Sequence, residues 1–208
     1  METRTILLWA AVLLAPVLLY SCALVRTEKA DYAVLSKQGK FEIRQYASHI
    51  VAETSVNASF EEAGNVAFRR LFDYISGNNQ KKESIAMTAP VKQAARSEKI
   101  AMTAPVQQRQ AQDRFDISFV MPSKYTMDTL PDPLNSDVVL REIPARKIAA
   151  IRYSGTWKQS RYEAKKDLLE AFINTKGLTA TDQATFARYD PPFQLPFLRR
   201  NEVLIPVE

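Results

Sequence analysis

Residues 85–91 read I-A-M-T-A-P-V, and residues 100–106 read I-A-M-T-A-P-V again. A repeat of this length is far beyond coincidence in a chain of this composition. Each copy has the short, apolar and β-branched character of a strand that ends at a proline. The polar residues 92–99 between the copies predict an exposed loop that joins two edge segments. Taken alone, the identity is explained equally well by a recent local duplication with no chemistry in it.

Alternation along a strand places every second residue on the same face. Met87 of the first copy and Met102 of the second are therefore expected to point the same way. Methionines form a soft and adaptable apolar surface, which suits a core and also suits a pocket for a flat apolar ligand. The full alternating set is Ile85, Met87, Ala89, Ile100, Met102 and Ala104.

Composition indicates one folded domain with an N-terminal addition. The chain has 208 residues, of which 46% are hydrophobic and 25% are charged, which is typical of a globular protein. The net charge is +5, but the basic residues are scattered and form no long Lys/Arg run. The sequence therefore does not favour nucleic-acid binding. Separately, we expect the domain to be a monomer.

Residues 1–25 are predicted to be a targeting segment outside the fold. Arg4 supplies a positive start, and residues 6–20 form an apolar run of the length found in signal peptides. The run ends in L-Y-S-C, which resembles a bacterial lipobox, although Tyr20 departs from the usual small or aliphatic residue. Lipidation of Cys22 is favoured over an uncleaved helical anchor. Cys22 is the sole cysteine, so no internal disulfide is possible.

Both alternatives tether the body, residues 26–208, to a membrane outside the cytoplasm. The expected location is the cell envelope, on the periplasmic side. Ala23 follows Cys22, and the lack of an acidic residue there favours the outer membrane over the inner membrane for a lipidated protein.

The first half of the body predicts strands at residues 32–35, 41–46 and 49–56, followed by a helix. Ser59 and Glu62 have the spacing of a capping box, and Gly77 is placed to end the helix. Intervals of three and four predict one buried stripe. Its members are Phe60, Ala63, Gly64, Ala67, Phe68, Leu71, Phe72 and Ile75.

The repeated segments and a strand predicted at residues 115–121 complete the first half. After a long loop over 122–137, the second half repeats the order of two strands, a helix and two strands, with strands predicted at 138–143, 147–153, 186–189 and 202–207 and a helix over 160–175. The expected fold is α+β: a distorted antiparallel β-barrel with pseudo-twofold symmetry, flanked by two helices. A pocket is expected between the helices and the curved sheet. The predicted buried side of the second helix carries Tyr162, Leu168, Leu169, Phe172 and Ile173.

Several separated motifs resemble the SOUL/heme-binding protein family. Besides the repeat, they are M-P-S-K-Y-T at 121–126, L-P-D-P at 130–133, A-R-Y-D-P-P at 187–192 and L-P-F-L-R-R-N-E-V at 195–203. They appear in the family's order and cover nearly all of residues 31–207. The resemblance implies a distorted antiparallel barrel with two helices that binds heme or a related tetrapyrrole in or beside an apolar cleft. Small-molecule-binding domains of bacterial regulators share the fold, so the family predicts the fold better than the ligand.

A tetrapyrrole needs a flat apolar slot, cations for two propionates and, optionally, an axial ligand. Arg199 and Arg200 suit propionates because guanidinium pairs well with carboxylate; the alternative is an exposed turn before the last strand. His49 is the only histidine and the candidate metal ligand, but Gln45 lies in the stretch that matches the family, so a surface histidine is the favoured interpretation. The expected cofactor-binding residues are Phe68, Leu71, Phe72, Met87, Met102, Arg199 and Arg200.

An enzyme is the weaker alternative. The sequence has no G-x-S-x-G, no metal-ligand cluster and no phosphate loop. Hydrolases exist on related folds, but nothing in the spacing supports Glu53 or Glu142 as a general base. A carrier, buffer or scavenger of a tetrapyrrole is expected. Another apolar small molecule, or a protein partner bound through residues 122–137, remains the alternative.

Overall fold

The computed structural model describes residues 27–82 and 97–208. The N-terminal segment with Cys22 and the first copy of the repeat with Met87 lie outside the described residues. Among residues 27–82 and 97–208, neither helix combines the length and the apolar character that crossing a bilayer requires.

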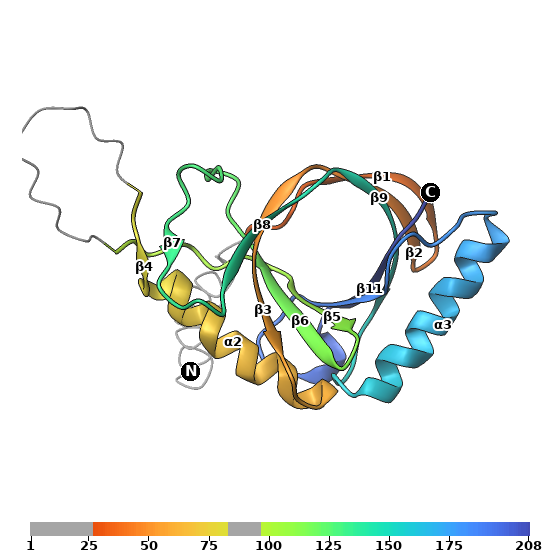
Figure 1. The fold of residues 1–208 in the computed structure, drawn as a ribbon. Coiled ribbons are helices and arrows are strands. Elements are labelled where there is room, and N and C mark those ends of the chain that lie inside the picture. The colour runs from red at the N-terminus through yellow and green to blue at the C-terminus, as the bar shows by residue number, and fades with distance from the viewer. Residues whose placement is uncertain (1–26, 83–96) are drawn as a thin grey trace, which may run out of the picture.

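Nine strands form one curled antiparallel sheet in the described part of the chain, and two helices lie against its outer face (Figure 1). The strand order is β1-β2-β9-β11-β10-β5-β6-β3-β8. A separate pair joins β4 to β7. The bounds are β1 (Tyr32–Gln38), β2 (Phe41–Tyr46), β3 (His49–Val56), α2 (Phe60–Ser76), β4 (Asn79–Gln80), β5 (Val106–Ala111), β6 (Arg114–Val120), β7 (Asp132–Pro133), β8 (Val139–Ile143), β9 (Arg146–Tyr153), α3 (Gln159–Thr175), β10 (Thr185–Arg188), the 3₁₀ turn η1 (Pro196–Leu198) and β11 (Asn201–Pro206).

The strand order confirms the predicted pseudo-twofold architecture. Exchanging β2 with β8, β9 with β3, β11 with β6 and β10 with β5 reproduces the same order read backwards, so the axis lies between β10 and β5. Helix α2 packs on β3 and β6, and α3 packs on their counterparts β9 and β11. β1 is an addition at one edge. Since no pairing joins β1 to β8 among the described strands, the sheet is a curled half-barrel and not a closed barrel.

The predicted limits of α2 are confirmed. The Ser59 hydroxyl accepts a hydrogen bond from the Glu62 N–H at 3.4 Å and donates to the Glu62 carboxylate at 2.8 Å. Gly77 ends the helix with a φ of 123°, a conformation that a side chain would strain. The helix therefore has fixed ends, and its buried side is held against the sheet.

Both predicted helix stripes were too wide. Phe72 is 46% exposed and Leu168 is also exposed, whereas their neighbours Leu71 and Leu169 are fully buried. Consecutive helical residues are about 100° apart, so both members of such a pair cannot face the sheet. Phe172 is confirmed as a core residue, 7% exposed, and it stacks on Phe41 with 4.6 Å between ring centroids.

The strand predicted at residues 100–106 does not form. Residues 97–103 follow an irregular path in which the Ile100 N–H donates to the Ile75 carbonyl, and strand β5 starts only at Val106. Ile100 is buried while Met102 is exposed, so the two do not share a face. The polar run Q-Q-R-Q of β5 was missed, because pairing with β6 and β10 defines this strand and apolar alternation does not.

The two phenylalanines give a direct test of this packing. Phe172→Ala should lower the free energy of unfolding by about 3–5 kcal/mol, because a buried ring is lost. Phe72→Ala should cost less than about 1 kcal/mol, because its ring is half-exposed. Urea unfolding followed by circular dichroism measures both. Equal losses for the two variants would contradict the assigned helix orientation.

Candidate functional site

An apolar cleft of about 660 Å³ lies beside α2. One wall is α2, a second is the segment from Met102 to Val106, and a third is the chain that follows β10. We call it the apolar cleft. Its lining residues are Thr27, Gly64, Asn65, Phe68, Arg69, Phe72, Met102, Thr103, Ala104, Val106, Trp157, Arg188, Tyr189, Asp190, Pro191 and Pro192.

The α2 wall of the apolar cleft presents two parallel aromatic rings. Phe68 and Phe72 lie one helical turn apart, with ring centroids separated by 5.7 Å and planes inclined by 12°. Phe68 makes an edge-on contact with the buried ring of Phe119, while Phe72 and Met102 are exposed. The structure thus brings together three of the predicted site residues, Phe68, Phe72 and Met102, as an accessible apolar surface. Leu71 is instead fully buried in the core beneath α2.

Arg188, at the end of β10, is the unexpected residue of the apolar cleft. Its guanidinium lies over the rings of Trp157 and Phe186, 5.1 Å and 5.7 Å from their centroids. Its Nε is buried without a hydrogen-bond partner. Burial lowers the pKa of Arg188 to about 10, and no carboxylate of the described residues opposes that effect. The remainder of the side chain is partly accessible through the cleft that it lines.

A glycine in α2 makes room for this side chain. A Cβ added at Gly64 would overlap Nη2 of Arg188 and lie 2.6 Å from its Nη1. Glycine within a helix is unfavourable relative to alanine by roughly 0.5–1 kcal/mol. At position 64 the missing Cβ allows the guanidinium to approach the helix backbone closely.

Behind the cleft, the interior of the curled sheet holds a buried ion-pair network. Glu202 is fully buried, and its carboxylate accepts hydrogen bonds from Arg44 at 2.6 and 3.0 Å and from Arg200 at 2.8 and 3.0 Å. The Tyr189 hydroxyl donates to the same carboxylate at 2.9 Å. Burial alone would raise the pKa of Glu202, but hydrogen bonds and charge from Arg44, together with Arg200, outweigh it and hold the pKa below its usual range. Tyr189 connects this network to the cleft that it also lines.

The two predicted propionate partners lie outside the apolar cleft. Arg199 donates to the carbonyl oxygens of Gln194 and Pro192, at 2.8 and 2.6 Å, and lies over Trp157. Arg200 is engaged with Glu202. Protein acceptors therefore already occupy both guanidinium groups, and the cations that line the cleft are Arg69 and Arg188.

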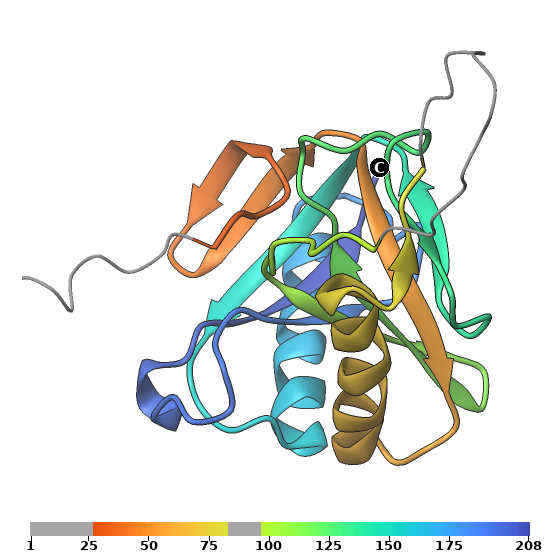
Figure 2. The ribbon, with the colours of Figure 1, turned by 90° about the vertical axis from the view of Figure 1, so that its left-hand side faces the viewer.

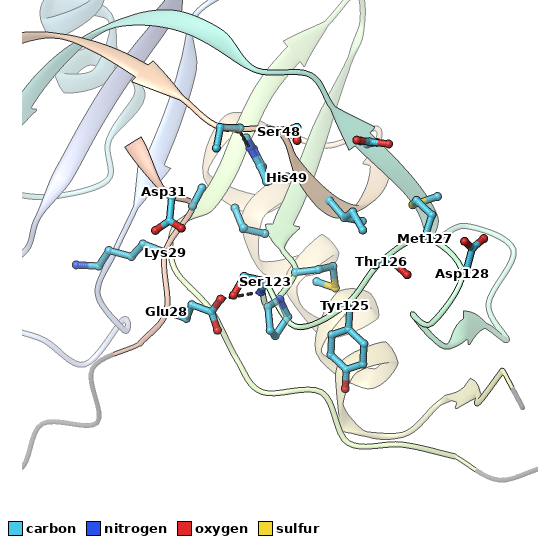
Figure 3. A pocket seen from close by; sticks show the side chains of 17 residues that line it. Glu28, Lys29, Asp31, Ser48, His49, Ser123, Tyr125, Thr126, Met127 and Asp128 are labelled. Atoms are coloured by element: carbon cyan, nitrogen blue, oxygen red, sulfur yellow. Dashed lines mark hydrogen bonds between the residues drawn. The ribbon is translucent and has the colours of Figure 1, made fainter. Parts of the chain in front are cut away.

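His49 lines a different cavity, of about 420 Å³, which we call the His49 pocket (Figure 3). Its Nδ1 lies 3.0 Å from the Ala47 carbonyl, and burial lowers the pKa of His49. Glu28 enters from the start of the body and accepts a hydrogen bond from the Ser123 N–H at 2.7 Å. Four carboxylates line this pocket against a single lysine, Lys29. The acidic residues are Glu28, Asp31, Asp128 and Glu142.

The structure does not bring the histidine and the methionine to one site. His49 and Met102 line separate cavities. Across residues 27–82 and 97–208, no three His, Cys, Asp or Glu side chains gather as metal ligands. Sequence reasoning missed Gly64, Trp157 and Arg188. Arg188 lies within the A-R-Y-D-P-P motif, but its lack of an acceptor becomes visible only in the fold.

Comparison with known proteins identifies relatives along nearly the whole body. The sequence profile of the family described as "SOUL heme-binding protein" matches residues 27–206. Heme-binding protein 1 of Xenopus tropicalis is 27% identical over 164 residues, 78% of this chain and 81% of that protein. Heme-binding protein 2 of Homo sapiens is 27% identical over 167 residues, 79% of this chain and 77% of that protein.

Solved structures share the fold at lower sequence identity. The C-terminal domain of EcmrR superposes with a TM-score of 0.56 at 10% identity, covering 85% of this chain and 98% of that domain. A hydrolase from Listeria innocua gives a TM-score of 0.53 at 12% identity, covering 84% of this chain and 94% of the other. At such identities the likeness supports the α+β architecture and carries nothing about activity.

The buried network yields a stability prediction. Glu202→Ala should lower the free energy of unfolding by about 3–5 kcal/mol, because buried guanidinium groups lose their carboxylate. The matched control is Glu53→Ala, which removes a 2.7 Å pair with the half-exposed Arg141 and should cost about 1 kcal/mol or less. Chemical unfolding at neutral pH measures both losses.

The same network sets a pH dependence. Because the folded pKa of Glu202 lies below its ordinary value of 4.5, its contribution is fully present above that value and is lost as the pH falls through the folded pKa. Stability of the parent should therefore decrease more steeply below about pH 4.5 than stability of Glu202→Gln. Parallel acid profiles for the two proteins would contradict the assignment.

Proposed function

The chain belongs to the SOUL heme-binding protein family, and on that premise we propose that it binds heme or a related tetrapyrrole in the apolar cleft. The observation that carries the proposal is the pair of stacked, accessible rings of Phe68 and Phe72 facing a cleft of about 660 Å³. Met102 adds a polarizable, adaptable contact on the facing segment. A flat macrocycle matches such a surface.

Apolar contact is expected to supply most of the affinity. Each Å² of apolar surface removed from water contributes about 25 cal/mol, from which the cost of ordering the complex is subtracted. The bound group would supply its own redox and ligand chemistry. The role of the protein would be to hold the ring and to keep water from its covered face. Phe68, Phe72 and Met102 are the residues that would do so.

Charge favours the apolar cleft over the His49 pocket. The propionates of a tetrapyrrole would meet four carboxylates in the His49 pocket and one cation, Lys29. In the apolar cleft they would meet Arg69 and Arg188, and the single acidic lining residue, Asp190, accepts a hydrogen bond from the Arg200 N–H. We therefore propose that His49 is not an obligatory iron ligand.

We propose in addition that the protein works as a carrier, buffer or scavenger tethered to a membrane outside the cytoplasm. Support comes from the apolar run at residues 6–20 and from a loop of exposed apolar side chains, led by Phe193 at 86% exposure. Thr27 and Pro192 line the same cleft, so the start of the body and this loop lie on one side of the molecule (Figure 2). The exposed residues of the loop are Phe193, Leu195, Phe197 and Leu198.

Hemin titration, followed through the Soret band, tests the site. Phe72→Ala should weaken binding about 10-fold, because one ring of the cleft wall is lost. His49→Ala should stay within a few-fold of the parent. Val139→Ala, which shortens an exposed apolar side chain outside the cleft lining, is the matched control. Iron-free protoporphyrin should bind within a few-fold of hemin, since apolar contact dominates.

Two outcomes would overturn parts of this proposal. Loss of the Soret shift in His49→Ala, with no binding of the iron-free ring, would place the ligand in the His49 pocket. If neither ring binds to the parent protein, the proposal of a tetrapyrrole ligand is wrong. Another apolar molecule or a protein partner would then be the proposed ligand.

The tether is tested separately, by mass spectrometry of protein extracted from membranes. A diacylglycerol group is expected on Cys22 at the new N-terminus, and Cys22→Ala should block the processing. A mature protein that retains Met1 would show that the lipidation proposal is wrong.

A further inference from the structure

Among the described residues, no hydrogen-bond acceptor is found for Arg188, in contrast to Arg44, Arg199 and Arg200. Arg44 and Arg200 share the carboxylate of Glu202, and Arg199 donates to two carbonyl oxygens. Arg188 has aromatic rings on its face and a buried Nε without a partner. A guanidinium carries five N–H donors in a rigid plane, and burying such donors without acceptors is unfavourable.

The fold fixes this guanidinium in place. The rings of Trp157 and Phe186 lie against it, and the α2 backbone at Gly64 approaches so closely that a Cβ there would overlap it. Cation–π contact stabilises the charge in part, but it leaves the N–H groups in the plane of the guanidinium unused. Both terminal nitrogens lie close to the α2 backbone at Gly64, and the Arg188 side chain also lines the apolar cleft, where a ligand can reach it.

The missing acceptor has a defined chemistry. Two parallel N–H groups of a guanidinium match the two oxygens of a carboxylate, and the match is strongest where water is excluded. Asp190, the one acidic residue in the lining of the apolar cleft, is turned to the Arg200 N–H at 2.5 Å and forms no ion pair with Arg188. A carboxylate carried by the ligand can supply this acceptor.

Building on the proposed function, we infer that Arg188 binds a carboxylate of the ligand and makes the apolar cleft selective for rings that carry free acid groups. Arg69 lies exposed on the α2 side of the same cleft. Solvent screens its charge, so it adds little to the selectivity.

The test compares protoporphyrin IX with its dimethyl ester, two iron-free rings that differ in the carboxylates alone. Binding to the full chain in detergent micelles is followed by porphyrin fluorescence. The parent should prefer the free acid by about 10-fold or more, the effect of one charge-assisted contact in a dry site. Arg188→Met should bring the preference close to unity, and Arg188→Lys should retain part of it.

Matched controls separate this effect from general loss of charge. Arg199→Met removes a cation from the same tryptophan, outside the apolar cleft, and should keep the preference of the parent. Gly64→Ala displaces the guanidinium without removing its charge and should reduce the preference. This variant carries the test if Arg188→Met does not fold.

The outcomes distinguish this inference from the proposed function. Equal affinity of the parent for acid and ester, or a preference that survives both Arg188→Met and Gly64→Ala, would overturn the role of Arg188 while leaving ring binding intact. If neither ring binds to the parent, the proposed function fails and the inference that rests on it fails as well.

Discussion

The buried carboxylate of Glu202 is the constraint on which the rest of the structure depends. A fully buried charge is tolerated only when it is paired and hydrogen-bonded, and Glu202 meets that condition through Arg44 on β2, Arg200 before β11 and Tyr189 after β10. These contacts tie one edge region of the sheet to the segment that leaves β10. Since that segment forms one wall of the apolar cleft, the interior network fixes the shape of the candidate site.

Adjacent residues at the end of β10 serve the two sides of the sheet. Side chains alternate along an extended chain, so Tyr189 joins the interior network while Arg188 lies on the side of α2. Glu202 accepts hydrogen bonds from both Arg44 and Arg200, whereas no acceptor from the described part of the chain is found for Arg188. An apolar surface with one unsatisfied guanidinium suits a ligand that combines an apolar body with an acid group. Heme and related tetrapyrroles are ligands of that kind.

Much of the fold could be predicted from local signals. The Ser59 cap, the Gly77 stop and the repeated order of elements were sufficient for α2 and for the pseudo-twofold sheet. Strand β5 could not be predicted, because its polar residues take their conformation from pairing with distant strands. The same limit applies to the site. Arg188, Arg199 and Arg200 look equivalent in the sequence. Only the folded chain shows that Arg199 and Arg200 have protein oxygens as acceptors and that the Arg188 Nε has none.

The central claim is that the ligand lies against α2, in the apolar cleft, and not in the acidic His49 pocket. A crystal structure of the full chain grown with hemin measures this most directly. The account predicts the ring over Phe68 and Phe72, with one propionate within hydrogen-bond distance of Arg188 and His49 free of iron. A ring seated in the His49 pocket, with its iron bound by the histidine, would contradict it.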